Sequence, residues 1–107
     1  MEIIIEFKAK RSGFQELYQT LQALIPTIRK KKGLQKVNFS RDSKDDENFI
    51  LSFEWEDQKN LQHYLRSNDG QALLGAIEVL SEQIKVKLGN HELIDGIESL
   101  KKLRDEI

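Results

Sequence analysis

Cysteine is absent from this chain, and several other features are scarce. Without cysteine there are no disulfides, thiolate metal ligands or cysteine nucleophiles, and a reducing cytoplasm is the simplest compartment. One proline and six glycines give no sign of an internal linker within 107 residues. No apolar run is long enough to cross a bilayer or act as a signal peptide, so no membrane association is expected. The sequence therefore predicts one compact domain, residues 1–107, in the cytoplasm.

Neither sign of charge dominates. Lysine and arginine number 17 against 18 acidic residues, and the net charge is −1. A dedicated nucleic-acid binder usually carries a clear basic excess, so that class is not favoured. The basic and aromatic signature of an RNA recognition module is also missing. Nucleic acid is therefore not a predicted partner.

Hydrophobic periodicity divides the chain into strands and helices. Alternation with a period of two predicts strands at about 2–10, 34–41, 49–56 and 82–93. Helical spacing predicts helices at about 13–32, 58–68, 70–80 and 96–105. The order strand, helix, strand, strand, helix, strand is that of the α+β ferredoxin-like fold, with an antiparallel sheet, helices on one face and an appended C-terminal helix.

Polar residues near the expected helix starts are candidate caps. Ser12 opens a capping box before the first helix, and Asp57 can cap the second. Asp69 is expected to start the short helix that follows, and Asp95 is expected to cap the last one. These residues place the helix starts near the positions that the periodicity predicts.

The sheet face opposite the helices is predicted to be mixed in character. Ile4 and Ile50 share it with charged side chains, and Glu6 is expected to form a cross-strand ion pair with Lys85 or Lys87. Such a surface is commonly covered by another subunit. A homodimer is the simplest interpretation.

The chain from Leu17 to Gly33 reads LYQTLQALIPTIRKKKG, and the chain from Phe53 to Ser67 reads FEWEDQKNLQHYLRS. With GIESL at 96–100, these stretches resemble the antibiotic biosynthesis monooxygenase family. Shared features are a proline late in the first helix, a tryptophan ending the third strand and a helix ending in Leu-Arg-Ser. The resemblance implies a dimeric α/β barrel of two ferredoxin-like subunits, with the fourth strand reaching across the dimer and a small cavity between each sheet and its helices.

The resemblance also implies a chemistry. Family members oxidise quinols or polycyclic phenols with molecular oxygen, using neither metal nor flavin, so no cofactor is expected. This reaction needs a polar group to orient or deprotonate the phenol, aromatic walls and exclusion of water. A non-catalytic homodimer that binds a small hydrophobic or aromatic ligand, or that serves as an interaction module, is the alternative. Haem binding is a third, although the haem-degrading branch has an asparagine in its first strand where this chain has Glu6 and Phe7.

Tyr64 is the predicted catalytic residue, as a hydrogen-bond donor or acceptor for a substrate oxygen. It stands where family members usually carry a histidine, whereas His63 comes one residue earlier and is turned to solvent by the helical phase. The remaining pocket residues predicted from the sequence are Trp55, Tyr18, Phe14, Phe53 and Leu61. A plain core role is the alternative for the aromatic residues among them. No residues have the spacing of a zinc site, so no metal is predicted.

Overall fold

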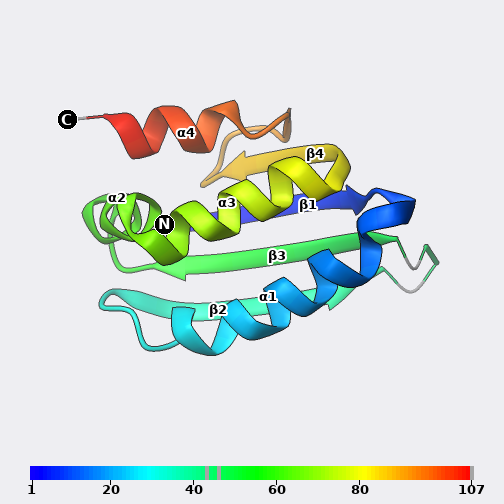
Figure 1. Ribbon diagram of the computed structural model, residues 1–107. Coiled ribbons are helices and arrows are strands. Elements are labelled where there is room, and N and C mark those ends of the chain that lie inside the picture. The colour runs from blue at the N-terminus through cyan, green and yellow to red at the C-terminus, as the bar shows by residue number, and fades with distance from the viewer. Residues whose placement is uncertain (43, 46, 107) are drawn as a thin grey trace.

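A five-stranded antiparallel sheet forms one layer of the protein, in the order β2-β3-β1-β4-β5 (Figure 1). The computed structural model describes residues 1–42, 44–45 and 47–106. The strands are β1 (Glu2–Ala9), β2 (Leu34–Arg41), β3 (Asn48–Trp55), β4 (Ser81–Leu88) and β5 (Ile94–Asp95). The helical segments are the short 3₁₀ helix η1 (Arg11–Gly13), α1 (Phe14–Ile28), α2 (Gln58–Arg66), α3 (Asn68–Leu80) and α4 (Glu98–Asp105). The predicted α+β ferredoxin-like fold is confirmed.

The core lies between this sheet and its helices. Alternation along β1 buries Ile3, Ile5 and Phe7, while the residues between them remain partly exposed. In β3 the same alternation buries every second residue from Phe49 to Trp55. Because side chains of a strand point to opposite faces in turn, both central strands present one apolar face to the helix layer.

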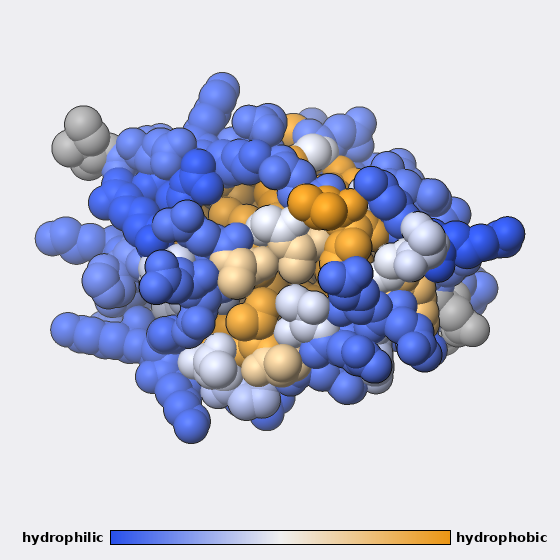
Figure 2. Space-filling model, in the orientation of Figure 1, coloured by the Kyte–Doolittle hydropathy of each residue, from blue (hydrophilic) through white to orange (hydrophobic). Residues whose placement is uncertain are grey.

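Helices α1, α2 and α3 cover one face of the sheet, and α4 lies beyond β4 (Figure 1). In Figure 2, which views the helix-covered side, apolar side chains gather in the middle of the surface and polar ones surround them. Val79 on α3 is 63% exposed. Within the described residues, no helix is both long and apolar enough to cross a bilayer.

The start and end of α1 differ from the prediction. Ser12 makes no capping bond, because it lies within η1 and the residue at the helix start is Gly13. At the other end α1 stops at Ile28, short of the predicted 32. The turn then tightens, since the Lys31 amide bonds back to the Ile28 carbonyl, and the chain turns at Gly33 with φ of 86°. A positive φ suits glycine, which has no Cβ.

One of the predicted caps in the α2–α3 region is confirmed, and one is wrong. Asp57 caps α2, with its Oδ1 accepting from the Asn60 amide at 2.8 Å. The cap of α3 is Ser67 rather than Asp69, and its Oγ accepts from the Gly70 amide at 3.1 Å. The Ser67 hydroxyl also donates to the Tyr64 carbonyl at the end of α2. One serine thus serves both helix ends, which explains why α3 begins before Asp69.

The predicted long fourth strand is two segments. β4 ends at Leu88, and Gly89 follows with φ of 56°, a left-handed conformation that turns the chain. The two residues of β5 then pair antiparallel with Lys85 and Val86 of β4. Asp95 therefore lies in β5 and does not cap α4, whose N-terminal flanking residue is Ile97 and has no side-chain cap.

Helix α4 is held to α2 by polar side chains as well as apolar ones. Leu100 and Leu103 are buried on its inner side. At its end, Arg66 Nε donates to the Arg104 carbonyl at 2.6 Å, and Gln62 Nε2 donates to the Leu103 carbonyl at 3.0 Å. The Leu103 carbonyl also accepts from the Glu106 amide at 3.4 Å, so the Gln62 bond adds to that one. The Arg66 bond pairs a carbonyl of the last helical turn, where carbonyls have no partner within the helix.

Candidate functional site

Trp55 and Tyr64 stack on each other at one end of the sheet. Trp55 is the last residue of β3, and Tyr64 comes from the inner face of α2. Their ring centres are 5.3 Å apart with an interplanar angle of 29°. Phe53 lies 6.3 Å from each ring, and Leu61 shares the buried face of α2. The structure therefore brings together the predicted donor Tyr64 and two of its predicted aromatic walls.

Both stacked side chains carry a buried polar atom without a hydrogen-bond partner in the described residues. Trp55 is 0% exposed and Tyr64 is 2% exposed, and the unpaired atoms are the indole Nε1 and the phenol oxygen. Most buried polar atoms in proteins are hydrogen-bonded, because an unpaired one loses its bonds to water without replacement. Two such atoms on stacked rings mark this position as the candidate site.

The environment of Tyr64 keeps its hydroxyl protonated. Burial raises its pKa well above the ordinary value, and the negative charge of Asp69 raises it further. Asp69 is itself paired with Lys31, with 2.9 Å between Nζ and Oδ2. At neutral pH Tyr64 is therefore a hydrogen-bond donor rather than a phenolate base. From the sequence, Asp69 is predicted only as a helix start, because nothing in the spacing shows that Lys31, just beyond α1, meets it in space.

Phe14 and Tyr18 lie in a second aromatic cluster. Their rings pack with Phe49, at 5.5 and 6.0 Å between ring centres, and Phe39 of β2 and Phe7 of β1 complete the cluster. Phe49 is six positions before Trp55 on the same strand, which corresponds to about 20 Å. The structure thus does not bring Phe14 and Tyr18 to Trp55, and the expected single pocket walled by both sets is not what is observed.

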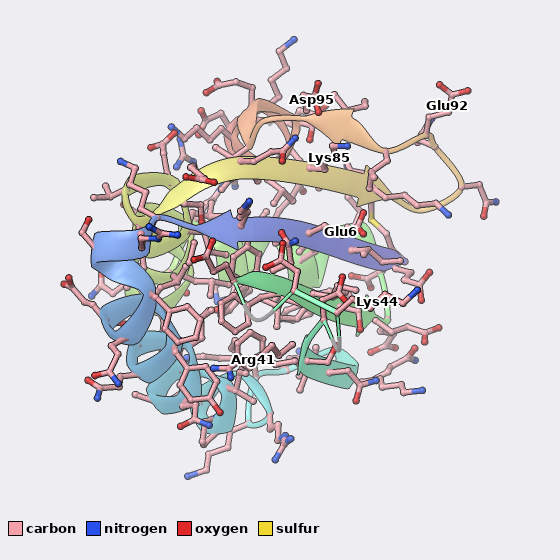
Figure 3. All side chains as sticks on the ribbon, turned by 90° about the vertical axis from the view of Figure 1, so that its right-hand side faces the viewer. Glu6, Arg41, Lys44, Lys85, Glu92 and Asp95 are labelled. Atoms are coloured by element: carbon pink, nitrogen blue, oxygen red, sulfur yellow. The ribbon has the colours of Figure 1, made fainter. Side chains whose placement is uncertain are left out.

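Arg41 covers the second cluster from the solvent side (Figure 3). Its guanidinium carbon lies 4.8 Å from the ring centre of Phe14, 5.1 Å from that of Tyr18 and 5.6 Å from that of Phe49. These distances are within the range of cation–π contacts. Arg41 could not be predicted from the sequence, because the rings that it contacts come from separate elements.

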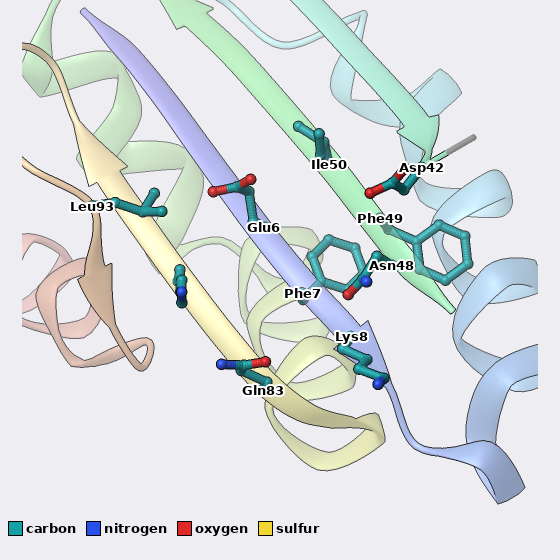
Figure 4. Close-up of a pocket in the computed structure, with 10 residues that line it drawn as sticks. Glu6, Phe7, Lys8, Asp42, Asn48, Phe49, Ile50, Gln83 and Leu93 are labelled. Atoms are coloured by element: carbon teal, nitrogen blue, oxygen red, sulfur yellow. The ribbon is translucent and has the colours of Figure 1, made fainter. Parts of the chain in front are cut away.

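The open face of the sheet is hollowed. A pocket of about 290 Å³ includes Glu6, Ile50 and Leu93 (Figure 4), and an adjoining hollow of about 630 Å³ shares these three residues. Leu93 reaches this face from the connection between β4 and β5. In the sheet register Glu6 is opposite Lys85, but the described residues include no ion pair between these two side chains, so the predicted ion pair is not observed. The surface combines apolar patches with both signs of charge.

The side chains that could bind a metal ion do not cluster in the described part of the chain. His63 is exposed on α2, as the helical phase predicts. Within the described residues there is no group of at least three histidine, cysteine, aspartate or glutamate residues that could hold a metal ion.

The sequence model of the antibiotic biosynthesis monooxygenase family matches residues 1–74. The match covers more than half of the chain and includes both Trp55 and Tyr64. The chain therefore belongs to this family. A search of curated proteins gives no significant match.

Solved structures with the same fold extend over most of the chain. A crystal structure of an antibiotic biosynthesis monooxygenase has a TM-score of 0.76 at 18% identity, covering 85% of this chain and 97% of that one. A Pseudomonas aeruginosa protein has a TM-score of 0.74 at 20% identity, covering 85% and 93%. A Shewanella oneidensis protein has a TM-score of 0.75 at 17% identity, covering 87% and 90%. At these identities the likeness shows a shared fold.

Proposed function

We propose that this protein is a cofactor-independent monooxygenase that oxidises a quinol or polyphenolic aromatic with molecular oxygen. Family membership supports the reaction class, and the two buried, unpaired polar atoms on Trp55 and Tyr64 support the location. The active site lies around this pair, with Phe53 and Leu61 as apolar walls. Tyr64 orients a substrate oxygen, and the surrounding apolar side chains exclude water from the reacting ring.

The overall reaction needs no external reductant. A hydroquinone and one O₂ give a hydroxyquinone and one water: one oxygen atom enters the ring and the other leaves as water. The substrate supplies all four electrons that reduce O₂ and both hydrogens of the water. The role left to this chain is therefore to bind and orient the ring and to keep water away.

Access to the site requires movement. Trp55 and Tyr64 are almost fully enclosed, so a ligand reaches them only when neighbouring side chains are displaced. The Lys31–Asp69 ion pair connects the end of α1 with the start of α3 next to Tyr64. We place the entrance at this junction, because the ion pair is partly solvent-exposed and can open without exposing the centre of the core.

Oxygen consumption by protein stripped of metal and flavin tests the proposal. A panel of hydroquinones and anthrones should include at least one substrate whose oxygen uptake exceeds the uncatalysed rate. Tyr64→Phe should lower this rate, and His63→Ala, which changes the exposed neighbouring residue, should leave it unchanged. Uptake at the background rate across the whole panel would refute the proposal.

A second candidate function is binding without turnover. The buried side chains around Trp55 and Tyr64 include no histidine or carboxylate that could remove a proton, and Tyr64 itself stays protonated. A homodimer that only binds a small aromatic ligand would show ligand-dependent thermal stabilisation with no oxygen uptake. Sustained turnover would exclude this alternative.

We further propose that two copies pair through their open sheet faces, in the cytoplasm. Ile50 and Leu93 are 36% and 41% exposed there, and the charges of Glu6 and Lys85 allow opposite signs to meet across a two-fold axis. Ile50→Glu should shift the molecular mass in solution, measured by light scattering, from dimer to monomer. Val79→Glu places the same charge on an exposed apolar position of α3 and should leave the dimer intact. A wild-type monomer at micromolar concentration would contradict the pairing.

A further inference from the structure

Positive charge is concentrated in one part of the chain. Residues 17–41, which form most of α1 and all of β2, contain six lysine and arginine residues and no acidic residue. The remaining residues contain the other eleven of the 17 basic side chains and all 18 acidic ones, so they carry a net charge of −7. The overall net charge of −1 is therefore the sum of a strongly basic part and an acidic remainder.

Four exposed cations gather where the end of α1 meets the start of α2. They are Arg29, Lys30, Lys32 and Lys59, and we call them the basic turn. The two segments are in direct contact, because a Cβ on Gly33 would lie 2.4 Å from the Asn60 side chain. The Gly33 carbonyl also accepts from the Glu56 amide at 2.7 Å. The basic turn therefore lies at the end of the sheet where β3 ends and α2 begins (Figure 1).

The fold itself does not use the charges of the basic turn. None of its four side chains forms an ion pair within the described residues. The carbonyls of Ile25, Thr27 and Ile28 at the end of α1 already accept from backbone amides. A cation near a helix C-terminus gains from the helix dipole, but Lys31, which pairs with Asp69, already supplies one there. The four charges are therefore available to a partner outside the molecule.

The surface around the basic turn stays positive when the adjacent carboxylates are counted. Glu56 and Asp57 adjoin it, which sets two carboxylates against four cations. Asp42 and Asp45 follow the other end of β2, more than about 20 Å away along the strand. Salt screens charges beyond about 8–10 Å under physiological conditions, so these acidic residues do not offset the basic turn.

We propose that the basic turn docks the protein on the surface of a bilayer that contains anionic phospholipids. Its cations stand close together at one end of the molecule, so they can meet several headgroups of a planar surface at once. The acidic remainder of the protein is repelled by the same surface, which favours a single orientation. The exposed large apolar residues (Ile50, Val79, Leu93 and Ile94) lie on other elements, so the contact is electrostatic and reversible and needs no spanning segment.

Single-stranded nucleic acid is the other polyanion that a basic surface attracts. Its binding sites combine cations with aromatic side chains on which the bases stack. Trp55 and Tyr64 are at the same end of the sheet as the basic turn, but both are buried. The half-exposed rings of Phe14 and Tyr18 belong to the second aromatic cluster, toward the other end of β2. The basic turn thus offers charge without a stacking platform, which suits a bilayer surface better.

Docking has a consequence for the proposed active site, although it does not depend on that site. The Lys31–Asp69 ion pair, where we place the entrance, is flanked by Lys30 and Lys32. A docked protein would turn this entrance toward the lipid. Apolar quinols concentrate in hydrocarbon, so the enzyme would meet its substrate where the substrate is most abundant.

Co-sedimentation of the whole chain with vesicles tests the proposal. One set of vesicles contains phosphatidylcholine alone, and the other also contains about 30 mol% phosphatidylglycerol. The protein should sediment with the anionic vesicles at about 0.05 M salt and not with the neutral ones. Raising the salt to about 0.5 M should release it, because the Debye length then falls well below 10 Å.

Two variants of equal net charge distinguish the basic turn from bulk charge. The turn variant is Arg29→Gln, Lys30→Gln and Lys32→Gln. The control variant removes three exposed lysines elsewhere: Lys10→Gln, Lys44→Gln and Lys102→Gln. Each cation near an anionic surface contributes about fivefold to binding, so the turn variant should bind about a hundredfold more weakly and the control within about threefold of wild type. Thermal unfolding should be unchanged in both, because all six side chains are exposed.

Spin labels report the orientation without altering any cation. The chain has no cysteine, so Gln35→Cys near the basic turn and Gln15→Cys at the other end of α1 each give one labelled position. On anionic vesicles, a water-soluble nickel complex should reach the label at position 35 less readily and the label at position 15 as before.

Four results would overturn the proposal. They are no sedimentation with anionic vesicles, equal losses in the two variants, equal protection of the two labels, and release of the bound protein by single-stranded oligothymidylate at a matched phosphate concentration. The last result would assign the basic turn to nucleic acid. Oxygen uptake is measured without lipid, so the proposed oxidation and the proposed docking fail separately.

Discussion

Removing the Tyr64 hydroxyl should stabilise the ligand-free protein. Tyr64→Phe keeps the ring that stacks on Trp55 at 5.3 Å and deletes only the buried, unpaired oxygen. A buried polar group without a partner costs about 1–3 kcal/mol, so the free energy of unfolding should rise by about 1 kcal/mol or more. For a domain near this size, each kcal/mol raises Tm by roughly 4–8 °C. Most substitutions of buried residues lower the free energy of unfolding, so an increase of any size would support the unpaired hydroxyl.

Urea denaturation and thermal unfolding, each compared with wild type, measure this effect. His63→Ala on the same helix serves as the control and should change the stability by less than about 0.5 kcal/mol, because its side chain is exposed. A Tyr64→Phe protein less stable than wild type would show that the hydroxyl has a partner in the free protein and is not an unpaired donor.

Three further predictions concern the surrounding structure. Gly70→Ala should lower the free energy of unfolding by about 3 kcal/mol or more, because its Cβ would lie 2.0 Å from the Tyr64 carbonyl oxygen. Gly75→Ala, in open space on the same helix, should instead raise the free energy of unfolding, by at most about 1 kcal/mol; urea denaturation measures both. Arg66→Ala should speed amide exchange in the last turn of α4 and leave exchange in α1 unchanged. Above about pH 10 the unfolded chain releases the Tyr64 proton, whereas the folded protein retains it because burial raises the pKa of Tyr64. The free energy of unfolding should therefore be unaffected by this group below that pH and fall by about 1.4 kcal/mol per pH unit above it. In pH-dependent denaturation, Tyr64→Phe should lack this part of the alkaline loss of stability.

The strands and helices could be predicted from the sequence because each has one apolar face. Alternation in β1 and β3 and the spacing of leucines in α1 depend only on which side each residue faces, which is a local property. Element ends were less predictable, because several residues compete for each one. Ser67 rather than Asp69 caps α3 since it also bonds the end of α2, and Gly89 ends β4 by turning the chain before Leu93.

The candidate site was predictable in part for the same reason. Helical phase places Tyr64 inward and His63 outward, and strand alternation places Trp55 inward, so their burial follows from local pattern. Three other features depend on how distant elements are aligned along the sheet, and no spacing within a single element contains that information. They are the stacking of Trp55 on Tyr64, the separation of Phe14 and Tyr18 from that pair, and the Lys31–Asp69 ion pair.

The position of β1 in the sheet has a consequence for folding. β1 is the first strand in the chain and the middle strand of the sheet, where it pairs with β3 on one side and β4 on the other. The contact with β4 joins residues about 80 positions apart, so the apolar side chains of β1 have no complete set of strand neighbours until most of the chain has left the ribosome. The hairpin of β2 and β3 can form earlier from nearby residues, and late insertion of β1 between β3 and β4 would then assemble the layer against which Trp55 and Tyr64 pack.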